Sequence, residues 1–182
     1  MRLATLALAA ALAAPHAAAQ SVEERSLEIA GETLRYTLRT HSAEAHLSDP
    51  AAAPSQGSAL DTAKLLNQYL AAGKLEEAAL LSNAPKRRYE VFRDYRLDVG
   101  EEPFRQAFAQ YFTKENRLAA EIAIGTHTLL IWHLARTDHY AGLFFMQIDG
   151  RMLIDDVPSE ARSRLRRLLE AWRSGEIRPA GR

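Results

Sequence analysis

Residues 117–157 read RLAAEIAIGTHTLLIWHLARTDHYAGLFFMQIDGRMLIDDV, and this stretch decides the fold. Before it, apolar residues recur with the helical spacing of about 3.6, whereas after Asn116 they recur with the strand spacing of about two. The dipeptide Asp149-Gly150 favours a two-residue hairpin turn, because both positions tolerate positive φ. We therefore expect an antiparallel meander of four strands, at residues 118–124, 126–135, 139–148 and 151–157.

Helical patterns lie on both sides of this stretch. Ser58 or Asp61 can cap a first helix, which Gly73 ends, and residues 74–81 form a second short helix behind it. A basic and aromatic segment, PKRRYEVFRDYR, follows. A further helix is predicted from Pro103 to Phe112, with its aromatic residues along one side. A last helix is capped by Ser159 and ended by Gly175, and its apolar side carries Leu165, Leu168, Leu169 and Trp172.

Residues 21–41 predict a separate β-hairpin, because apolar residues alternate on either side of the turn Ala30-Gly31. The fold class is therefore α+β: N-terminal helices packed on a curved antiparallel meander sheet, with an extra N-terminal hairpin and a C-terminal helix. The sequence leaves open whether the hairpin joins the main sheet. The expected segments are a signal peptide at 1–19, the hairpin at 20–41, a flexible linker at 42–57, an α+β domain at 58–175 and a tail at 176–182.

The first residues predict export. Arg2 supplies a positive charge, residues 3–14 contain only Leu, Ala and Thr, and Ala17-Ala18-Ala19 offers the small residues that a signal peptidase recognises. The twelve apolar residues are too few to span a bilayer, which takes about 20. We expect a cleaved signal peptide and a soluble periplasmic or secreted bacterial protein. An Ala-rich buried helix is the alternative, which Pro15 fits badly.

Composition excludes several classes of function. The chain has no cysteine, so disulfides, thiolate metal sites and cysteine nucleophiles are absent. Its 23 basic and 23 acidic side chains balance, which argues against a nucleic-acid binder. We see no cofactor motif, no metal-ligand spacing such as HExxH, no GxSxG elbow and no integral membrane segment after the signal. The sequence thus predicts no cofactor and no metal.

From Ser58 to Val157 the chain resembles the NTF2-like (SnoaL-like, cystatin-like cone) superfamily. The resemblance rests on helices followed by a meander, and on HYAGLFFMQIDGRMLIDDV, which looks like the closing hairpin of that family. It implies helices on the concave face of a bent sheet with a pocket between them. The N-terminal hairpin and the C-terminal helix depart from the family pattern. The family holds both enzymes and non-catalytic binding modules, so the resemblance does not fix the function.

One candidate catalytic group lies on the central strands. His133 shares a strand face with His127, and Asp155 and Asp156 point to opposite faces, so one of these carboxylates can approach His133. A His–Asp pair would abstract a proton or activate water, with Tyr95 or Tyr111 as hydrogen-bond donor. The alternative is structural: His133 bonds a loop carbonyl, and the two aspartates form a polar strand exit.

The basic segment is the second candidate. Arginines interleave there with aromatic residues, which are favoured anchors of protein interfaces and of anionic ligands. The alternative is an amphipathic helix with aromatics in the core and solvated arginines. The candidate binding residues are Arg87, Arg88, Tyr89, Phe92, Arg93, Tyr95, Arg96 and, from the central strand, Trp132.

Two functions follow. The first is an exported non-catalytic binding module for a protein partner or a small ligand, one version being an immunity-type protein that neutralises a periplasmic toxin. The second is a small cone-pocket enzyme that performs proton-transfer or hydrolytic chemistry with the His–Asp pair. A second copy of the chain is a further candidate partner. A large pocket around His133 would favour the enzyme, and a filled one would favour binding by the surface.

Overall fold

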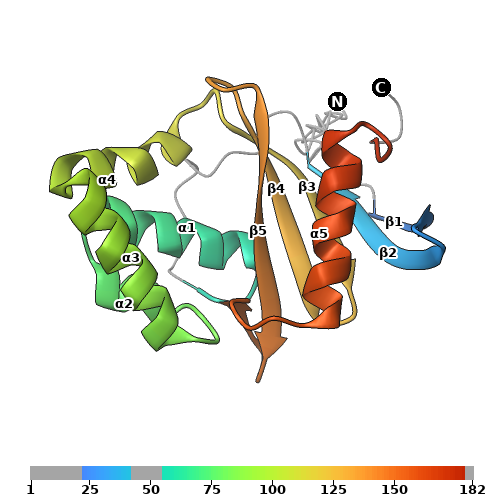
Figure 1. Ribbon diagram of the computed structural model, residues 1–182, viewed down its shortest axis with the longest axis horizontal. Helices are drawn as coiled ribbons and strands as arrows, with labels where there is room; N and C mark the ends of the chain where they lie inside the picture. The colour runs from blue at the N-terminus through green and yellow to red at the C-terminus, as the bar shows by residue number, and fades with distance from the viewer. Residues whose placement is uncertain (1–21, 42–54, 179–182) are drawn as a thin grey trace, which may run out of the picture.

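The computed structural model describes residues 22–41 and 55–178, so the predicted signal peptide and most of the predicted linker lie outside the described residues. The fold is α+β, with one antiparallel sheet in the order β1-β2-β3-β4-β5-β6 (Figure 1). The strands are β1 Val22–Ile29, β2 Glu32–Thr40, β3 Arg117–Ile124, β4 His127–Leu134, β5 His139–Ile148 and β6 Arg151–Ile154. The helices are α1 Ala59–Ala71, α2 Leu75–Ala79, α3 Pro85–Val99, α4 Glu101–Ala109, a short 3₁₀ turn η1 Gln110–Phe112, and α5 Glu160–Arg173.

Local signals set these elements much as the sequence predicts. Ala30 and Asp149 have φ of 52° and 49° and each precedes a glycine with positive φ, which confirms both two-residue turns. The side chains of Ser58 and Ser159 accept the backbone N–H groups of Asp61 and Arg162, each at 3.1 Å, so both predicted caps are confirmed.

Several predicted boundaries differ from the structure by one to three residues, and two of these differences have a clear cause. Helix α4 begins at Glu101 rather than Pro103, because Gly100 with φ of 92° breaks the chain and a proline is tolerated in a first helical turn. Strand β6 ends at Ile154 rather than at 157. Asp155 N–H still donates to the Phe144 carbonyl of β5, but the side chains of Asp155 and Asp156 bind Asn83 in the loop between α2 and α3 and Arg88 in α3.

The N-terminal hairpin belongs to the main sheet. Residues Thr37–Thr40 of β2 pair with Ala120–Ala123 of β3, which makes one continuous six-stranded sheet. Leu38 is fully buried at this seam, and Tyr36 is 6% exposed. The question that the sequence left open is therefore answered by packing between segments about 80 residues apart.

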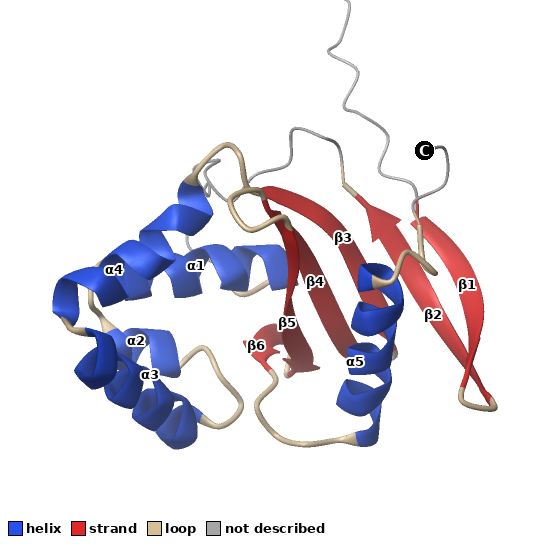
Figure 2. Cartoon of the chain, turned by 45° about the horizontal axis from the view of Figure 1, so that its top comes forward, coloured by secondary structure: helices blue, strands red, loops and turns tan. Residues whose placement is uncertain are grey.

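Helices cover both faces of the sheet. Figure 2 shows α1–α4 on one side and α5 on the other. Strand β4 alternates between these layers: Leu130 and Trp132 lie in the core beneath α1–α4, whereas Leu129 and Ile131 lie in the core beneath α5. A strand buried on both faces carries a nearly continuous apolar run, which is why residues 128–132 show no polar alternation.

The seam between hairpin and sheet gives a first prediction. Leu38→Ala should lower the free energy of unfolding by about 2–5 kcal/mol, because it leaves a cavity in a fully buried site. Urea denaturation followed by circular dichroism measures this, and the loss should come in a single transition. Leu27→Ala, on the half-buried outer strand, is the control and should cost less. Two separate transitions would contradict a hairpin that folds with the rest.

Glu121 on β3 gives a prediction about pH. Burial raises the pKa of its carboxyl, and the Arg39 guanidinium, 4.0 Å away, offsets only part of that rise. The folded state therefore favours the protonated acid, so this group's contribution to stability is lost as the pH rises through its folded pKa. Glu121→Gln should raise the free energy of unfolding at neutral pH, and the gain should shrink in buffers near the ordinary pKa of 4.5. Glu115→Gln, at an exposed glutamate, is the control, and its effect on the free energy of unfolding should not depend on pH in this way. An equal gain at both pH values for Glu121→Gln would contradict a raised pKa of Glu121.

Candidate functional site

A cluster of polar side chains joins the end of β6 to the loop between α2 and α3. The backbone prepares it, because Ile154 N–H donates to the carbonyl of Leu81 at 2.8 Å and Asn83 N–H donates to the carbonyl of Ile154 at 2.9 Å. We call this cluster the polar junction; its members are Ser82, Asn83, Arg88, His127, Asp155 and Asp156.

Asp156 forms one half of the polar junction. Arg88 donates to both of its carboxylate oxygens, from Nε at 2.6 Å and from Nη2, and Ser82 Oγ donates at 2.6 Å. Asp156 N–H in turn donates to Asn83 Oδ1 at 2.8 Å. The side chains of Arg88 and Asp156 are only 17% and 12% exposed. This two-pronged ion pair fixes the N-terminal end of α3 to the sheet.

Asp155 forms the other half and is 2% exposed. Its carboxylate accepts Asn83 Nδ2 at 2.8 Å and lies 3.1 Å from Nδ1 of His127, whose side chain is 14% exposed. A carboxylate on Nδ1 orients an imidazole and leaves Nε2 as the nitrogen for other partners. The two adjacent aspartates thus face different partners, as the strand alternation predicts.

The structure does not bring His133 to either aspartate. Its Nε2 lies 2.7 Å from Oδ1 of Asp138, whose side chain is 92% exposed, and its ring contacts Tyr140. His127 is six residues away on β4, which corresponds to about 20 Å of strand. Sequence reasoning placed His127 on the same face but gave it no role. Counting back from the Asp149-Gly150 turn would have set Asp155 beside Phe144, near His127, and the bond from Asp155 N–H to the Phe144 carbonyl shows that register.

A small cavity of about 140 Å³ separates α1, α3 and α4 from β4 and β5. Trp132 and Tyr111 line it, together with mostly apolar side chains and two polar ones, Asn67 and Arg88. Burial raises the pKa of Tyr111, with a smaller contribution from Tyr95. The indole N–H of Trp132 is sealed from solvent and has no hydrogen-bond partner among the described residues. No histidine or carboxylate lines this cavity.

The predicted basic segment forms α3, which lies on the outside of the helical layer. Only Phe92 of its fifteen residues is buried, with the Arg88 guanidinium 5.3 Å from its ring centroid, and Tyr89 is half-buried. Tyr95 packs edge-on against Phe108 but remains 41% exposed. The candidate binding residues of α3 therefore fall into two groups. Arg88 and Phe92 hold the helix in place, whereas Arg87, Arg93 and Tyr95 are exposed.

The surface of α3 carries apolar side chains and separated charges. Val91 and Leu97 are 53% and 75% exposed. Lys86 and Arg87 lie in the first turn, which contains no acidic residue, although a helix dipole favours anions there. Arg93 pairs with Asp94 at 2.7 Å, and Arg96 lies 3.6 Å from Glu101. We call the outward side of α3, formed by Lys86, Arg87, Glu90, Val91, Arg93, Asp94, Leu97 and Asp98, the α3 surface.

Comparison with known proteins gives this chain no relative: no protein-family model, no curated protein and no solved structure matches it. Within residues 22–41 and 55–178, no three His, Asp or Glu side chains are grouped to hold a metal ion. Over the same residues, no helix combines the length and apolar character that crossing a membrane requires.

The polar junction gives a prediction about stability. Asp156→Ala should lower the free energy of unfolding by about 2–3 kcal/mol, because it leaves the largely buried Arg88 guanidinium without its carboxylate. The double variant Asp156→Ala, Arg88→Leu should recover part of that loss, as urea denaturation of both variants would show. Asp98→Ala, at an exposed aspartate of α3, should stay within about 0.5 kcal/mol of the parent chain. A double variant no more stable than Asp156→Ala would show that the stranded charge is not the cause.

Proposed function

We propose that the chain is an exported, non-catalytic binding module that holds a protein partner on the α3 surface. The observation that carries this proposal is the burial of a single residue, Phe92, in a helix of fifteen. Helices of this length are marginal on their own in water and normally gain stability from a buried face. Val91 and Leu97 of α3 point outward and are not part of a buried face.

The chemistry of the α3 surface fits a protein partner. Val91 and Leu97 offer exposed apolar contacts, and arginine, present on this surface as Arg87 and Arg93, is among the side chains most often found as energetic anchors of interfaces. Its charges are polarised, with Lys86 and Arg87 at one end and Asp98 at the other, while Arg93 and Asp94 pair with each other between them. A matching partner presents acidic groups beside the first turn of α3 and basic groups beside its last turns.

The proposal includes export of the chain from the cytoplasm. The predicted signal peptide at residues 1–19 would deliver the chain to the periplasm or the medium. An immunity-type protein that neutralises a periplasmic toxin is the concrete version, since such a protein needs a docking surface and no catalytic group. The relation to the NTF2-like superfamily also stays a prediction. Its support is that helices precede the meander and pack on one face of the sheet, and α5 on the opposite face is the departure.

The enzymatic alternative has one observation in its favour. His127 and the buried Asp155 form a hydrogen-bonded pair in which the carboxylate orients the ring, as in an activated general base. The cavity between the helices and the sheet lacks these residues, and its 140 Å³ is below the few hundred Å³ of ordinary ligand pockets. The geometry therefore favours binding over catalysis.

A reconstituted complex tests the proposal. The mature chain, used as bait on an envelope fraction of the source bacterium, should retain a protein that, once purified, forms a stoichiometric complex. Val91→Asp and Leu97→Asp should each weaken that complex at least tenfold, measured by calorimetry, because each places a charge in the apolar part of the contact. Val22→Asp is the matched control, an exposed apolar residue on β1 that should change nothing.

Two outcomes would overturn the proposal. One is a complex that both α3 variants form as tightly as the parent chain. The other is a failure to recover any stoichiometric partner, together with a hydrolytic or proton-transfer activity of the mature chain that His127→Ala abolishes. The second outcome would establish the enzymatic alternative.

A further inference from the structure

Strand β2 has backbone on its β3 side that no strand within residues 22–41 and 55–178 covers. The strand runs from Glu32 to Thr40 and pairs with β1 along its whole length. It pairs with β3 only at Thr37–Thr40, because β3 ends at Ile124 and the chain turns back at Gly125. Figure 2 shows the hairpin diverging from the other strands toward its own turn.

The register shows which backbone groups face this open side. In a hairpin with a two-residue turn, the residues flanking the turn form a hydrogen-bonded pair, here Ile29 and Glu32. Alternation then directs the N–H and C=O groups of Leu34 and Tyr36 to β1, and those of Thr33 and Arg35 to the opposite side. No strand in the described part of the chain pairs with these groups of Thr33 and Arg35. They form an edge within the sheet, and such an edge is a template for another strand.

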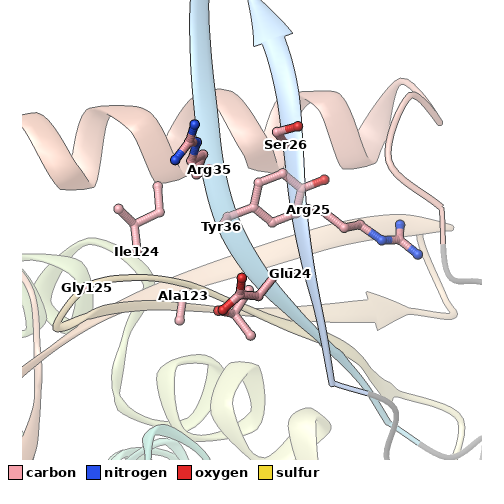
Figure 3. A pocket seen from close by; sticks show the side chains of 9 residues that line it. Glu24, Arg25, Ser26, Arg35, Tyr36, Ala123, Ile124 and Gly125 are labelled. Carbon is pink, nitrogen blue, oxygen red and sulfur yellow. The ribbon is translucent and has the colours of Figure 1, made fainter.

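A groove runs beside this edge. An open hollow of about 450 Å³ lies between the hairpin and the end of β3, and Figure 3 shows Arg35, Tyr36 and Ser26 on its hairpin side and Ala123 and Gly125 on its β3 side. A second hollow of about 220 Å³ is lined by Thr33, Leu34 and Arg164 among others. Both hollows share Arg35 and Ile124, so they adjoin along the same strand. The small side chains at the end of β3 let a further backbone approach.

The side chains beside the open edge differ between its two faces. Leu34 faces the α5 side and is 2% exposed, with the half-buried Ile124 on the same side. Arg35 faces the opposite side, where it is exposed and makes no ion pair within the described part of the chain. The neighbouring arginines are already engaged, Arg25 with Glu23 and Arg164 with Glu32 and Glu160.

We propose that this open edge binds an extended segment of a partner protein by β-strand addition, a segment in which aliphatic and acidic side chains alternate. The added strand would continue the line of β3 beyond Ile124 and pair with Thr33 and Arg35. Its aliphatic side chains would lie on the half-buried Ile124, and its acidic side chains would meet Arg35. This site lies on the sheet, apart from the α3 surface, and does not depend on it.

Hydrogen exchange of the full chain tests the premise. The amides of Leu34 and Tyr36 should be protected by β1, whereas those of Thr33 and Arg35 should exchange at least tenfold faster, as NMR would resolve residue by residue. Equal protection of all four amides would show that the edge is already closed and would overturn the proposal.

Binding tests the occupant. A labelled heptapeptide that alternates Val and Glu should bind saturably with a dissociation constant below about 1 mM, read by fluorescence anisotropy. In an added strand, the backbone N–H groups of every second residue face β2. N-methylation of these residues should abolish binding, and N-methylation of the residues between them should not. Equal effects of the two sets, or no binding, would overturn the proposal.

A charge reversal tests the side-chain contact. Arg35→Glu should weaken the Val/Glu peptide at least tenfold and restore binding to a Val/Lys peptide, whereas Arg136→Glu, at an exposed loop arginine, should do neither. Circular dichroism of each variant establishes that the chain still folds. Unchanged peptide binding by Arg35→Glu would overturn the charge contact. A concentration-dependent dimer that the peptide does not dissociate would show that a second copy fills the edge instead.

Discussion

The burial of β4 on both faces is the constraint on which the rest of the structure depends. Residues 128–132 have at most 4% of their surface exposed, and the apolar ones, 129–132, divide alternately between the core under α1–α4 and the core under α5. A strand of this kind must be covered by two layers, since either face left open would expose large apolar side chains to water. The helices before the meander and the helix after it are therefore both needed to cover the same four residues.

The two layers are anchored in different ways. The α1–α4 layer is joined to the sheet by the polar junction, where one loop satisfies two adjacent aspartates and Arg88 secures the start of α3. On the other face, three of the five arginines of α5 make polar contacts with other elements: Arg164 and Arg167 both pair with Glu32 of the hairpin, and Arg173 donates to the carbonyl of Tyr140 on β5. Arg164 and Arg167 thus hold the hairpin against the helix.

Sequence reasoning succeeded where a signal is local. Turns at Ala30-Gly31 and Asp149-Gly150, caps at Ser58 and Ser159, and the change of spacing after Asn116 each depend on a few neighbouring residues. It could not give what depends on distant pairing: that β2 joins β3, that α5 covers the opposite face, and that His127 rather than His133 meets Asp155. These outcomes depend on which apolar surfaces meet, and many distant pairings satisfy the same local pattern equally well.

Coverage of both sheet faces also limits where recognition can occur. The space between the helices and the sheet is largely filled by side chains such as Trp132 and Phe145, and what remains is small and apolar. Groups still able to meet another molecule must therefore lie where packing within the chain ends. Two such places stand out: α3, which rests on other helices rather than on the sheet, and the part of β2 that extends past the end of β3. On α3 apolar side chains remain exposed, and on β2 the strand continues past the end of β3, so both places can receive another molecule without disturbing the core.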